Sequence, residues 1–284
     1  MRPTGKARVA GVIGWPVAHS RSPRVHGYWL DLYGIDGAYV PLAVPPQRLG
    51  DAIRGLAALG FRGANVTVPH KQAVMPFLDV IEAAAQRIGA VNTIVVGDNG
   101  LLTGTNTDGF GFLANLRAAC PGWRAADGPA VVIGAGGAAR AVVVSLLDAG
   151  VPSVRLINRT DARAHDLAGA LGGAPGTAIE VVAWDQRAAA LGDAGLLVNT
   201  TTQGMEGHAA LDLVLDDLPG AATVTDIVYT PLETPLLAAA RARGNPVVDG
   251  LGMLLHQARP GFQAWFGRLP EVTPALRDVV LAPG

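Results

Sequence analysis

The chain has almost no cysteine and no long hydrophobic run. Cys120 is the only cysteine among 284 residues, which excludes an internal disulfide and a cysteine-based zinc site. Such sparing use of cysteine is typical of a reducing compartment. No stretch approaches the ~20 consecutive apolar residues of a membrane span, and the apolar run 9–13 near the start is too short for a signal peptide. The sequence therefore predicts a soluble protein of the cytoplasm.

An excess of charge of one sign and metal-binding patterns are lacking as well. The formal net charge is −1, so no overall field attracts nucleic acid or a membrane surface. The six histidines are scattered without metal-ligand spacing, and the chain has neither a G-x-S-x-G nor an H-E-x-x-H segment. Half of the residues are hydrophobic, which is enough for a packed core. We therefore expect a small-molecule substrate, and no metal, nucleic-acid or membrane partner.

Strand-like and helix-like segments alternate along the chain, which is the pattern of an α/β fold with mostly parallel sheets. Ser22-Pro23 predicts a helix that starts with Ser22 as its N-cap, and Gly34 predicts the end of that helix. Asn99-Gly100 between two strands predicts a hairpin. A connector at 120–129 has little periodicity and separates two halves, so we predict two domains. The predicted strands cover 9–13, 38–44, 64–68, 91–96, 101–105, 130–133, 154–157, 196–200, 223–228 and 247–248.

A glycine-rich segment follows the predicted strand 130–133 and precedes the helical run 142–147. It has the form G-x-G-x-x-A, with Gly134, Gly136 and Ala139 at the marked positions. The first glycine permits a tight turn, the second lets the backbone approach a pyrophosphate, and the alanine lets helix and strand pack closely. The free amides of the helix N-terminus then face the phosphates. The segment predicts a dinucleotide site; the alternative is a glycine-rich turn without a ligand.

The next strand, 154–157, indicates which dinucleotide is bound. An NAD site usually carries an acidic residue at the end of this strand, where it holds the ribose 2′-hydroxyl. Here the strand ends in Asn158-Arg159-Thr160, and a guanidinium suits a 2′-phosphate instead. Arg163 adds a second positive charge, whereas Asp161 leaves dual cofactor use open. We therefore predict NADP; the alternative for Arg159 is a solvated loop arginine.

Polar residues interrupt the apolar pattern of the first half. The strand 64–68 places Asn65 and Thr67 on one face and is followed closely by Lys71. Ligands of α/β sheets gather at the carboxyl ends of strands, so this pattern indicates a binding cleft. The alternative is an edge strand with one solvated face.

Three further polar segments belong to the same half. Asn92 stands at a strand start, and Asp108 follows the predicted hairpin. Ser20 and Ser22 lie just before a helix start, where free amides favour an anion such as a substrate carboxylate. The structural alternatives are that Asp108 and Ser22 are only N-caps.

Together these segments resemble the shikimate dehydrogenase family. The stretches Asn-Val-Thr-x-Pro-x-Lys at 65–71 and Asn-Thr-Asp-Gly at 106–109 are specific to it. Departures are Trp15 and Gly27, where the family often has Asn, and Thr200, where Ala is common. The resemblance spans nearly the whole chain and is carried by 14–26, 65–71, 89–93, 106–109, 134–140, 158–160, 199–205, 226–231 and 249–257.

The resemblance implies reversible reduction of the 3-keto group of 3-dehydroshikimate to shikimate by NADPH, a step of aromatic amino acid biosynthesis. It implies Lys71 and Asp108 as the catalytic pair, which also contacts the ring hydroxyls. The implied substrate-binding residues are Ser20 and Ser22 for the carboxylate, Thr67, Asn92 and Gln257 for the hydroxyls, and Tyr229 beside the nicotinamide. The predicted cofactor-binding residues are Gly134, Ala135, Gly136, Gly137, Ala138, Asn158, Arg159, Thr160, Arg163, Thr200, Ile227, Gly250 and Met253.

The family fold also implies the domain organisation. An open, mostly parallel α/β domain for the substrate comprises 1–108 plus 251–284, and a Rossmann domain for NADP comprises 109–250, with a cleft between them. We expect a monomer or a homodimer. Two other functions stay open: a quinate or mixed quinate/shikimate dehydrogenase, and a catalytically silent NADP-binding sensor on the same scaffold.

Overall fold

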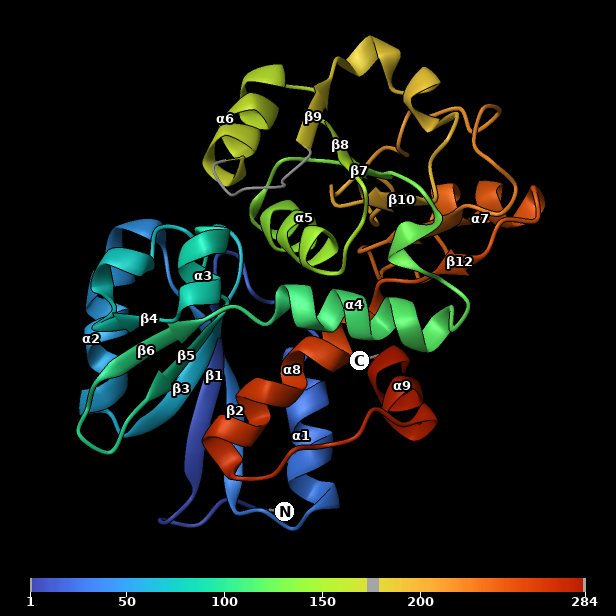
Figure 1. Ribbon diagram of the computed structural model, residues 1–284. Helices are drawn as coiled ribbons and strands as arrows, with labels where there is room; N and C mark the ends of the chain where they lie inside the picture. The colour runs from blue at the N-terminus through green and yellow to red at the C-terminus, as the bar shows by residue number, and fades with distance from the viewer. Residues whose placement is uncertain (1, 173–178, 283–284) are drawn as a thin grey trace. The chain divides into compact units, whose positions relative to one another are not determined.

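The computed structural model describes residues 2–172 and 179–282, which form two compact units (Figure 1). The first unit comprises the residues up to Thr107 and those from Leu254 onward, and the second comprises Asp108–Met253. Each unit contains its own six-stranded sheet. Helix α8 (Leu251–Phe266) starts in the second unit and continues in the first. The predicted two-domain α/β class is confirmed.

The sheet of the first unit is mixed. Its strand order is β2-β1-β3-β5-β6-β4. Strand β1 runs parallel to both of its neighbours, whereas β5 is antiparallel to β3 and to β6. The Asn99-Gly100 hairpin between β5 and β6 is confirmed, and Gly100 has the positive φ of 80° that such a turn requires. The strands are β1 (Arg8–Gly14), β2 (Gly37–Ala43), β3 (Phe61–Val66), β4 (Val80–Ile81), β5 (Thr93–Val96) and β6 (Leu102–Thr105).

Strand β3 differs from its predicted range of 64–68, because it starts at Phe61 and ends at Val66. Gly63 lies inside this strand. A Cβ there would lie 2.0 Å from the Ile94 carbonyl oxygen and 2.2 Å from Trp265 Nε1. The glycine is therefore required by close packing against α8. At the other end, Pro69 has no N–H to continue the ladder.

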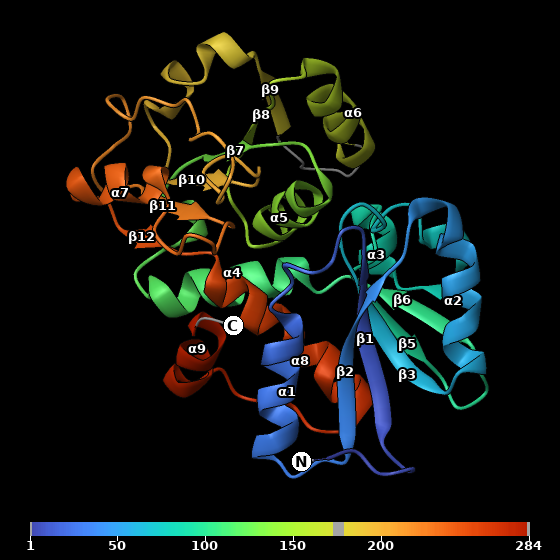
Figure 2. The same ribbon diagram turned by 180° about the vertical axis from the view of Figure 1, so that it is seen from behind.

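Helices cover both faces of this sheet (Figures 1 and 2). Helices α2 and α3 cover one face, where Ile53 packs with Ile13 and Val66. Helices α1 and α8 cover the other, where the Trp29 and Phe262 rings meet at 5.3 Å. The helices are α1 (Ser22–Leu32), α2 (Leu49–Ala58), α3 (Ala83–Ile88), α8 (Leu251–Phe266) and α9 (Pro274–Leu281), with 3₁₀ turns η1 (Pro46–Arg48) and η2 (Met75–Phe77).

The start of α1 corrects one prediction. Ser22 is the first helical residue and Arg21 occupies the N-cap position, without a side-chain capping bond. The Ser20 hydroxyl accepts the Ser22 N–H at 3.3 Å, so it satisfies one of the free backbone amides at the helix start. The Ser22 side chain instead lies beside the Tyr39 phenol. The predicted helix end is confirmed, since Gly34 has a φ of 61°.

A buried histidine sits among the aromatic rings between α1, β2 and α8. The His26 ring is fully buried and stacks on Tyr39 with centroids 3.9 Å apart. Its edge faces Trp29 at 5.8 Å. Burial lowers the pKa of His26 to about 3, because an imidazolium would lose its hydration there. The folded protein therefore holds this imidazole neutral.

This histidine makes stability depend on pH. Its unfolded pKa of 6.5 exceeds its folded value, so the unfolded chain binds the extra proton, and stability falls as pH drops below 6.5 towards 3. From pH 7.5 to 5.5 we expect a loss of about 1.4 kcal/mol from this group. Urea unfolding at both pH values measures it. In His26→Phe this part of the slope should vanish, whereas the same substitution at exposed His208 should preserve it. An unchanged slope in His26→Phe would contradict the assignment.

The sheet of the second unit is fully parallel, with strand order β12-β11-β10-β7-β8-β9. The chain first adds strands on one side of β7 and then on the other, so the direction reverses between β7 and β10. This order is that of the doubly wound dinucleotide-binding fold, in which ligands lie outside the carboxyl ends at the reversal point. The predicted Rossmann topology is confirmed. The strands are β7 (Ala130–Ile133), β8 (Val154–Ile157), β9 (Ile179–Val182), β10 (Leu196–Asn199), β11 (Thr223–Asp226) and β12 (Val247–Val248).

Helices cover both faces of the second sheet as well. Helix α7 packs on one face, where Leu237 joins a core with Ile133 and Val224. Helices α4 and α5 pack against each other through Gly109, where a Cβ would lie 3.0 Å from the Ala141 carbonyl oxygen. The helices are α4 (Asp108–Ala119), α5 (Gly137–Asp148), α6 (Asp161–Leu171) and α7 (Pro235–Ala242), with 3₁₀ turns η3 (Ala125–Asp127), η4 (Trp184–Gln186) and η5 (Ala189–Leu191).

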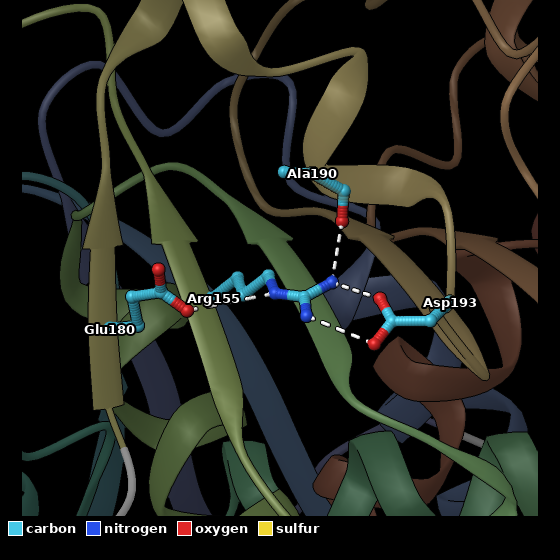
Figure 3. Close-up of polar contacts among 4 residues, drawn as sticks. All are labelled: Arg155, Glu180, Ala190 and Asp193. Carbon is cyan, nitrogen blue, oxygen red and sulfur yellow. Dashed lines mark hydrogen bonds and ion pairs between the residues drawn. The ribbon is translucent and has the colours of Figure 1, made fainter.

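An arginine in the middle of β8 has a structural role (Figure 3). Arg155 forms a two-pronged ion pair with Asp193 and donates from Nη1 to the Ala190 carbonyl at 2.9 Å. Its Nε lies 3.7 Å from Glu180 on β9. The Arg155 guanidinium lowers the pKa of the Asp193 carboxyl through this hydrogen bond and its charge. The side chain therefore links β9 to the segment that precedes β10. Its guanidinium is occupied by these protein partners and does not serve a ligand.

Candidate active site

The glycine turn after β7 lies at the reversal point of the second sheet. Gly134 has a φ of 114°, and a Cβ there would lie 2.5 Å from Thr200 Oγ1, so only glycine fits. Thr200 donates from both its backbone N and its hydroxyl to the Ile133 carbonyl, at 2.8 and 2.7 Å. The residue after β10 is thereby fixed against the end of β7, the place where a dinucleotide lies in this fold.

The next glycine opens a space at the start of α5. Gly136 is the N-cap of that helix, and no atom lies within 4 Å of the position that a Cβ would take. Ala139 is fully buried, which permits the close packing of helix and strand. The cradle therefore fits a pyrophosphate, which would meet the first amides of α5 at the space that a side chain would otherwise fill.

Two arginines stand on the segment between β8 and α6. Asn158 follows β8 directly and its Nδ2 donates to the Thr160 carbonyl at 2.8 Å, which shapes the turn. Arg159 and Arg163 are both exposed. Within residues 2–172 and 179–282, neither guanidinium takes part in an ion pair. Because β8 is the parallel neighbour of β7, these side chains are available to a phosphate on the adenosine ribose.

The far side of the sheet brings together the remaining predicted cofactor residues. The Ile227 N–H donates to the Asn199 carbonyl at 3.1 Å, which continues the pairing beyond β11. A Cβ at Gly250 would lie 2.4 Å from the Ile227 carbonyl oxygen, so only glycine lets the segment after β12 lie against it. Met253 is buried and Tyr229 is half-buried.

Sequence reasoning missed the polar pair that organises these segments. Asn199 and Asp226 are the last residues of β10 and β11, and both are fully buried. Asn199 Nδ2 donates to Asp226 Oδ1 at 3.0 Å, while Asp226 also accepts the Val228 N–H and the Thr234 hydroxyl. Burial raises the pKa of Asp226, and these three donors oppose the rise. Polar residues inside the predicted strands 196–200 and 223–228 were the signal in the sequence.

The first unit places several predicted residues near the end of β1. A Cβ at Gly14 would lie 2.6 Å from Thr67 Cγ2, so the glycine lets Thr67 pack against the strand end. The Thr67 N–H donates to the Ile13 carbonyl at 2.9 Å. The half-buried Lys71 is anchored through its carbonyl, which accepts the Val91 N–H at 2.8 Å. That bond sets the lysine backbone beside the segment that carries Asn92.

Asn92 is the centre of a buried polar cluster in this unit. Its Oδ1 accepts the Thr107 N–H at 2.9 Å, and its Nδ2 donates to the Thr107 hydroxyl at 3.0 Å. That hydroxyl donates in turn to the Gln257 carbonyl on α8 at 2.9 Å. Gln257 Oε1 is buried and has no partner in the part of the chain that the structure describes. A buried acceptor without a donor is costly, so this oxygen suits a ligand hydroxyl.

The two predicted catalytic residues belong to different units. Lys71 lies in the first unit, whereas Asp108 is the first residue of α4 in the second. The Asp108 side chain is 1% exposed. Their convergence on one reacting group stays a prediction.

No helix within residues 2–172 and 179–282 is long and apolar enough to cross a membrane. Over the same residues, no group of three or more His, Cys, Asp or Glu side chains is arranged to hold a metal ion.

The strand order of the second unit and its glycine cradle define a dinucleotide-binding α/β protein. The family model described as "Shikimate dehydrogenase substrate binding domain" matches residues 12–94, and "Shikimate / quinate 5-dehydrogenase" matches residues 122–206. A relative from Paramagnetospirillum magneticum, named Shikimate dehydrogenase (NADP(+)), is 61% identical over 98% of this chain and 100% of its own length. The chain belongs to the shikimate dehydrogenase family.

Solved structures agree with this assignment. Shikimate 5-dehydrogenase from Thermus thermophilus, in complex with NADP(H) and shikimate, superposes with a TM-score of 0.84 at 38% identity and covers 96% of this chain and 98% of its own. Quinate dehydrogenase from Corynebacterium glutamicum, in complex with NAD, gives a TM-score of 0.89 at 33% identity and covers 97% of this chain and 99% of its own. The fold alone therefore does not separate the two substrates or the two cofactors.

Proposed function

We propose that this protein is an NADP-dependent shikimate dehydrogenase, which reversibly reduces the 3-keto group of 3-dehydroshikimate to the hydroxyl of shikimate. The observation that carries the proposal is the 61% identity, over 98% of the chain, to a relative named for that activity and cofactor. The exposed Arg159 after β8 supports NADP over NAD, because a guanidinium matches a 2′-phosphate.

The first unit, with proposed bounds 1–108 and 251–284, would bind the substrate. Ser20 and Ser22 would hold the carboxylate at the start of α1, where backbone amides and the helix dipole favour an anion. Thr67, Asn92 and Gln257 would bind the ring hydroxyls, and the buried Gln257 Oε1 supports this role.

The second unit, with proposed bounds 109–250, would bind NADP. The segment 134–138 would hold the pyrophosphate, and Asn158, Arg159, Thr160 and Arg163 the adenosine 2′-phosphate. Thr200, Ile227, Gly250 and Met253 would line the nicotinamide side, with Tyr229 facing the substrate there.

The chemistry of the chain's own residues is proton transfer and positioning. NADPH, when bound, supplies the hydride to the keto carbon. The developing alkoxide needs a proton, and Lys71 Nζ would donate it, or accept it in the reverse direction. Asp108 would orient the Lys71 ammonium and share the hydrogen bond of the reacting hydroxyl. Ser20, Ser22 and Gln257 would hold the ring so that this hydroxyl meets the lysine.

The test compares four substrate and cofactor pairs in one absorbance assay of nicotinamide reduction. Shikimate or quinate is supplied with NADP or NAD, and kcat/KM is determined for each pair. We expect shikimate with NADP to give the highest value. A higher value for quinate would make the protein a quinate dehydrogenase, which the similarity to the Corynebacterium enzyme favours as second candidate. Binding of NADP without turnover of either acid would indicate a sensor.

We also propose a cytoplasmic location, with the chain as a monomer or a homodimer. The single cysteine supports a reducing compartment. Light scattering on the purified chain would determine the number of subunits.

A further inference from the structure

A largely buried network of side-chain hydrogen bonds leads from β2, beside the start of α1, to Asn92 in the predicted substrate site. Tyr39 on β2 donates from its hydroxyl to Asn65 Oδ1 at 2.6 Å, and the Ser22 side chain lies beside the same phenol. Asn65 Nδ2 donates to Thr93 Oγ1 at 3.1 Å and to the Asn92 carbonyl at 3.2 Å. Thr93 then donates from its hydroxyl to Asn92 Oδ1 at 2.9 Å.

The chemistry of the amide groups fixes the donor and acceptor roles between Asn65, Thr93 and Asn92. The Asn92 Oδ1 atom can only accept, so the Thr93 hydroxyl gives it its one proton and keeps its lone pairs to accept from Asn65 Nδ2. Asn65 and Thr93 are direct partners in the antiparallel pairing of β3 and β5, which places their side chains on the same face of the sheet. The Asn92 amide is then held at its oxygen by two donors, the Thr93 hydroxyl and the Thr107 N–H.

Three members of this network are buried, which limits the access of water to them. Thr93 is 1% exposed and Asn92 is 4% exposed, and Tyr39 stacks on His26 under α1. Burial raises the pKa of Tyr39 well above its usual value, so the phenol stays protonated and keeps its role as donor. Removing one member therefore leaves a neighbour without a partner and frees the next side chain to rotate.

We propose that Thr93, backed by Asn65 and Tyr39, is the positioning residue that sets the Asn92 carboxamide in its orientation for a substrate hydroxyl. The same chain reaches Ser22 at one end and Gln257 at the other, through Thr107. It therefore joins the residues proposed for the carboxylate to those proposed for the ring hydroxyls. The inference rests on the proposed function, because Asn92 must contact the substrate for its orientation to matter.

A pair of substitutions at one position separates positioning from packing. Thr93→Val keeps the shape and removes the hydroxyl, whereas Thr93→Ser keeps the hydroxyl and removes a methyl group. We expect Thr93→Val to raise KM for shikimate about tenfold, as for one lost buried hydrogen bond, with KM for NADP unchanged. Thr93→Ser should stay close to the parent in both constants and lose some thermal stability, because its buried methyl group is missing. If Thr93→Ser shows the larger rise and Thr93→Val none, the role is packing and the inference is wrong.

A variant at Tyr39 tests the other end of the hydrogen-bond network. Tyr39→Phe removes only the phenol hydroxyl, so it should also raise KM for shikimate several-fold at an unchanged KM for NADP. Tyr33→Phe is the matched control, since Tyr33 lies in the same unit and its hydroxyl accepts only the Glu271 N–H among the described residues. Tyr39→Phe keeps the inference testable if Thr93→Val does not fold. A parent protein without shikimate turnover overturns the proposed function, whereas an active parent with a Thr93→Val variant of unchanged KM overturns the inference alone.

Discussion

Replacing Lys71 with alanine is expected to lower kcat by about 10²–10⁴ with little change in KM, the usual range for a lost general acid or base. The reason is that the alkoxide formed at the substrate carbon would then take its proton from water. Binding should persist, because Ser20, Ser22 and Gln257 carry other parts of the substrate in the proposed site. Steady-state rates over a range of shikimate concentrations measure both constants.

The chain offers an unusually clean control for this experiment. Lys6 is the only other lysine in the sequence, and it is exposed near the N-terminus. Lys6→Ala should leave both constants unchanged. Lys71→Arg separates charge from proton transfer, because an arginine stays protonated and cannot shuttle a proton. We expect it to be nearly as slow as Lys71→Ala. Near-normal turnover in either Lys71 variant would remove this residue from the chemistry.

Replacing Arg159 with alanine is expected to raise KM for NADP by about ten- to a hundredfold, the size of a lost hydrogen bond to a charged group. KM for NAD should change little, since NAD has no 2′-phosphate for the guanidinium to contact. The ratio of kcat/KM for NADP to kcat/KM for NAD, which measures the cofactor preference, should therefore fall towards one.

Two comparisons make this result specific. Arg241 lies in the same unit and pairs with Glu233 on the surface, so Arg241→Ala should leave the cofactor preference intact. Arg163→Ala should give a smaller loss in the same direction, since Arg163 lies in the first turn of α6 and not directly after β8. An equal loss for NADP and NAD in Arg159→Ala would show that this arginine does not recognise the 2′-phosphate.

Local sequence signals predicted those parts of the fold that depend on neighbours along the chain. The Asn99-Gly100 hairpin follows from the positive φ that its turn requires, and Gly134 follows from the same kind of constraint. The alternation of strands and helices predicted the parallel sheet of the second unit, because parallel strands need crossover connections. These constraints involve only a few consecutive residues, so they are visible without a structure.

Contacts between distant segments could not be predicted in this way. Strand β3 starts at Phe61, before its predicted start at 64, and it needs glycine at 63 because Trp265, some two hundred residues later, occupies the space of a Cβ there. Ser22 suggested an N-cap, yet it is the first helical residue, and the Ser20 hydroxyl accepts its N–H. The pair Asn199 and Asp226 and the chain from Tyr39 to Asn92 likewise join residues from separate strands.

By itself, the sequence determined the class of fold, the glycine cradle for a pyrophosphate and the arginine that follows β8. Each of these features depends on a short run of consecutive residues whose physical role can be recognised locally. Only the tertiary structure decided which polar side chains stand behind the candidate substrate residues. Thr93 and Asn92 are adjacent in sequence, but the hydroxyl that donates to Asn92 Oδ1 is itself held by Asn65, which donates to it from the neighbouring strand. Such an arrangement depends on strand register and burial, which no local pattern specifies.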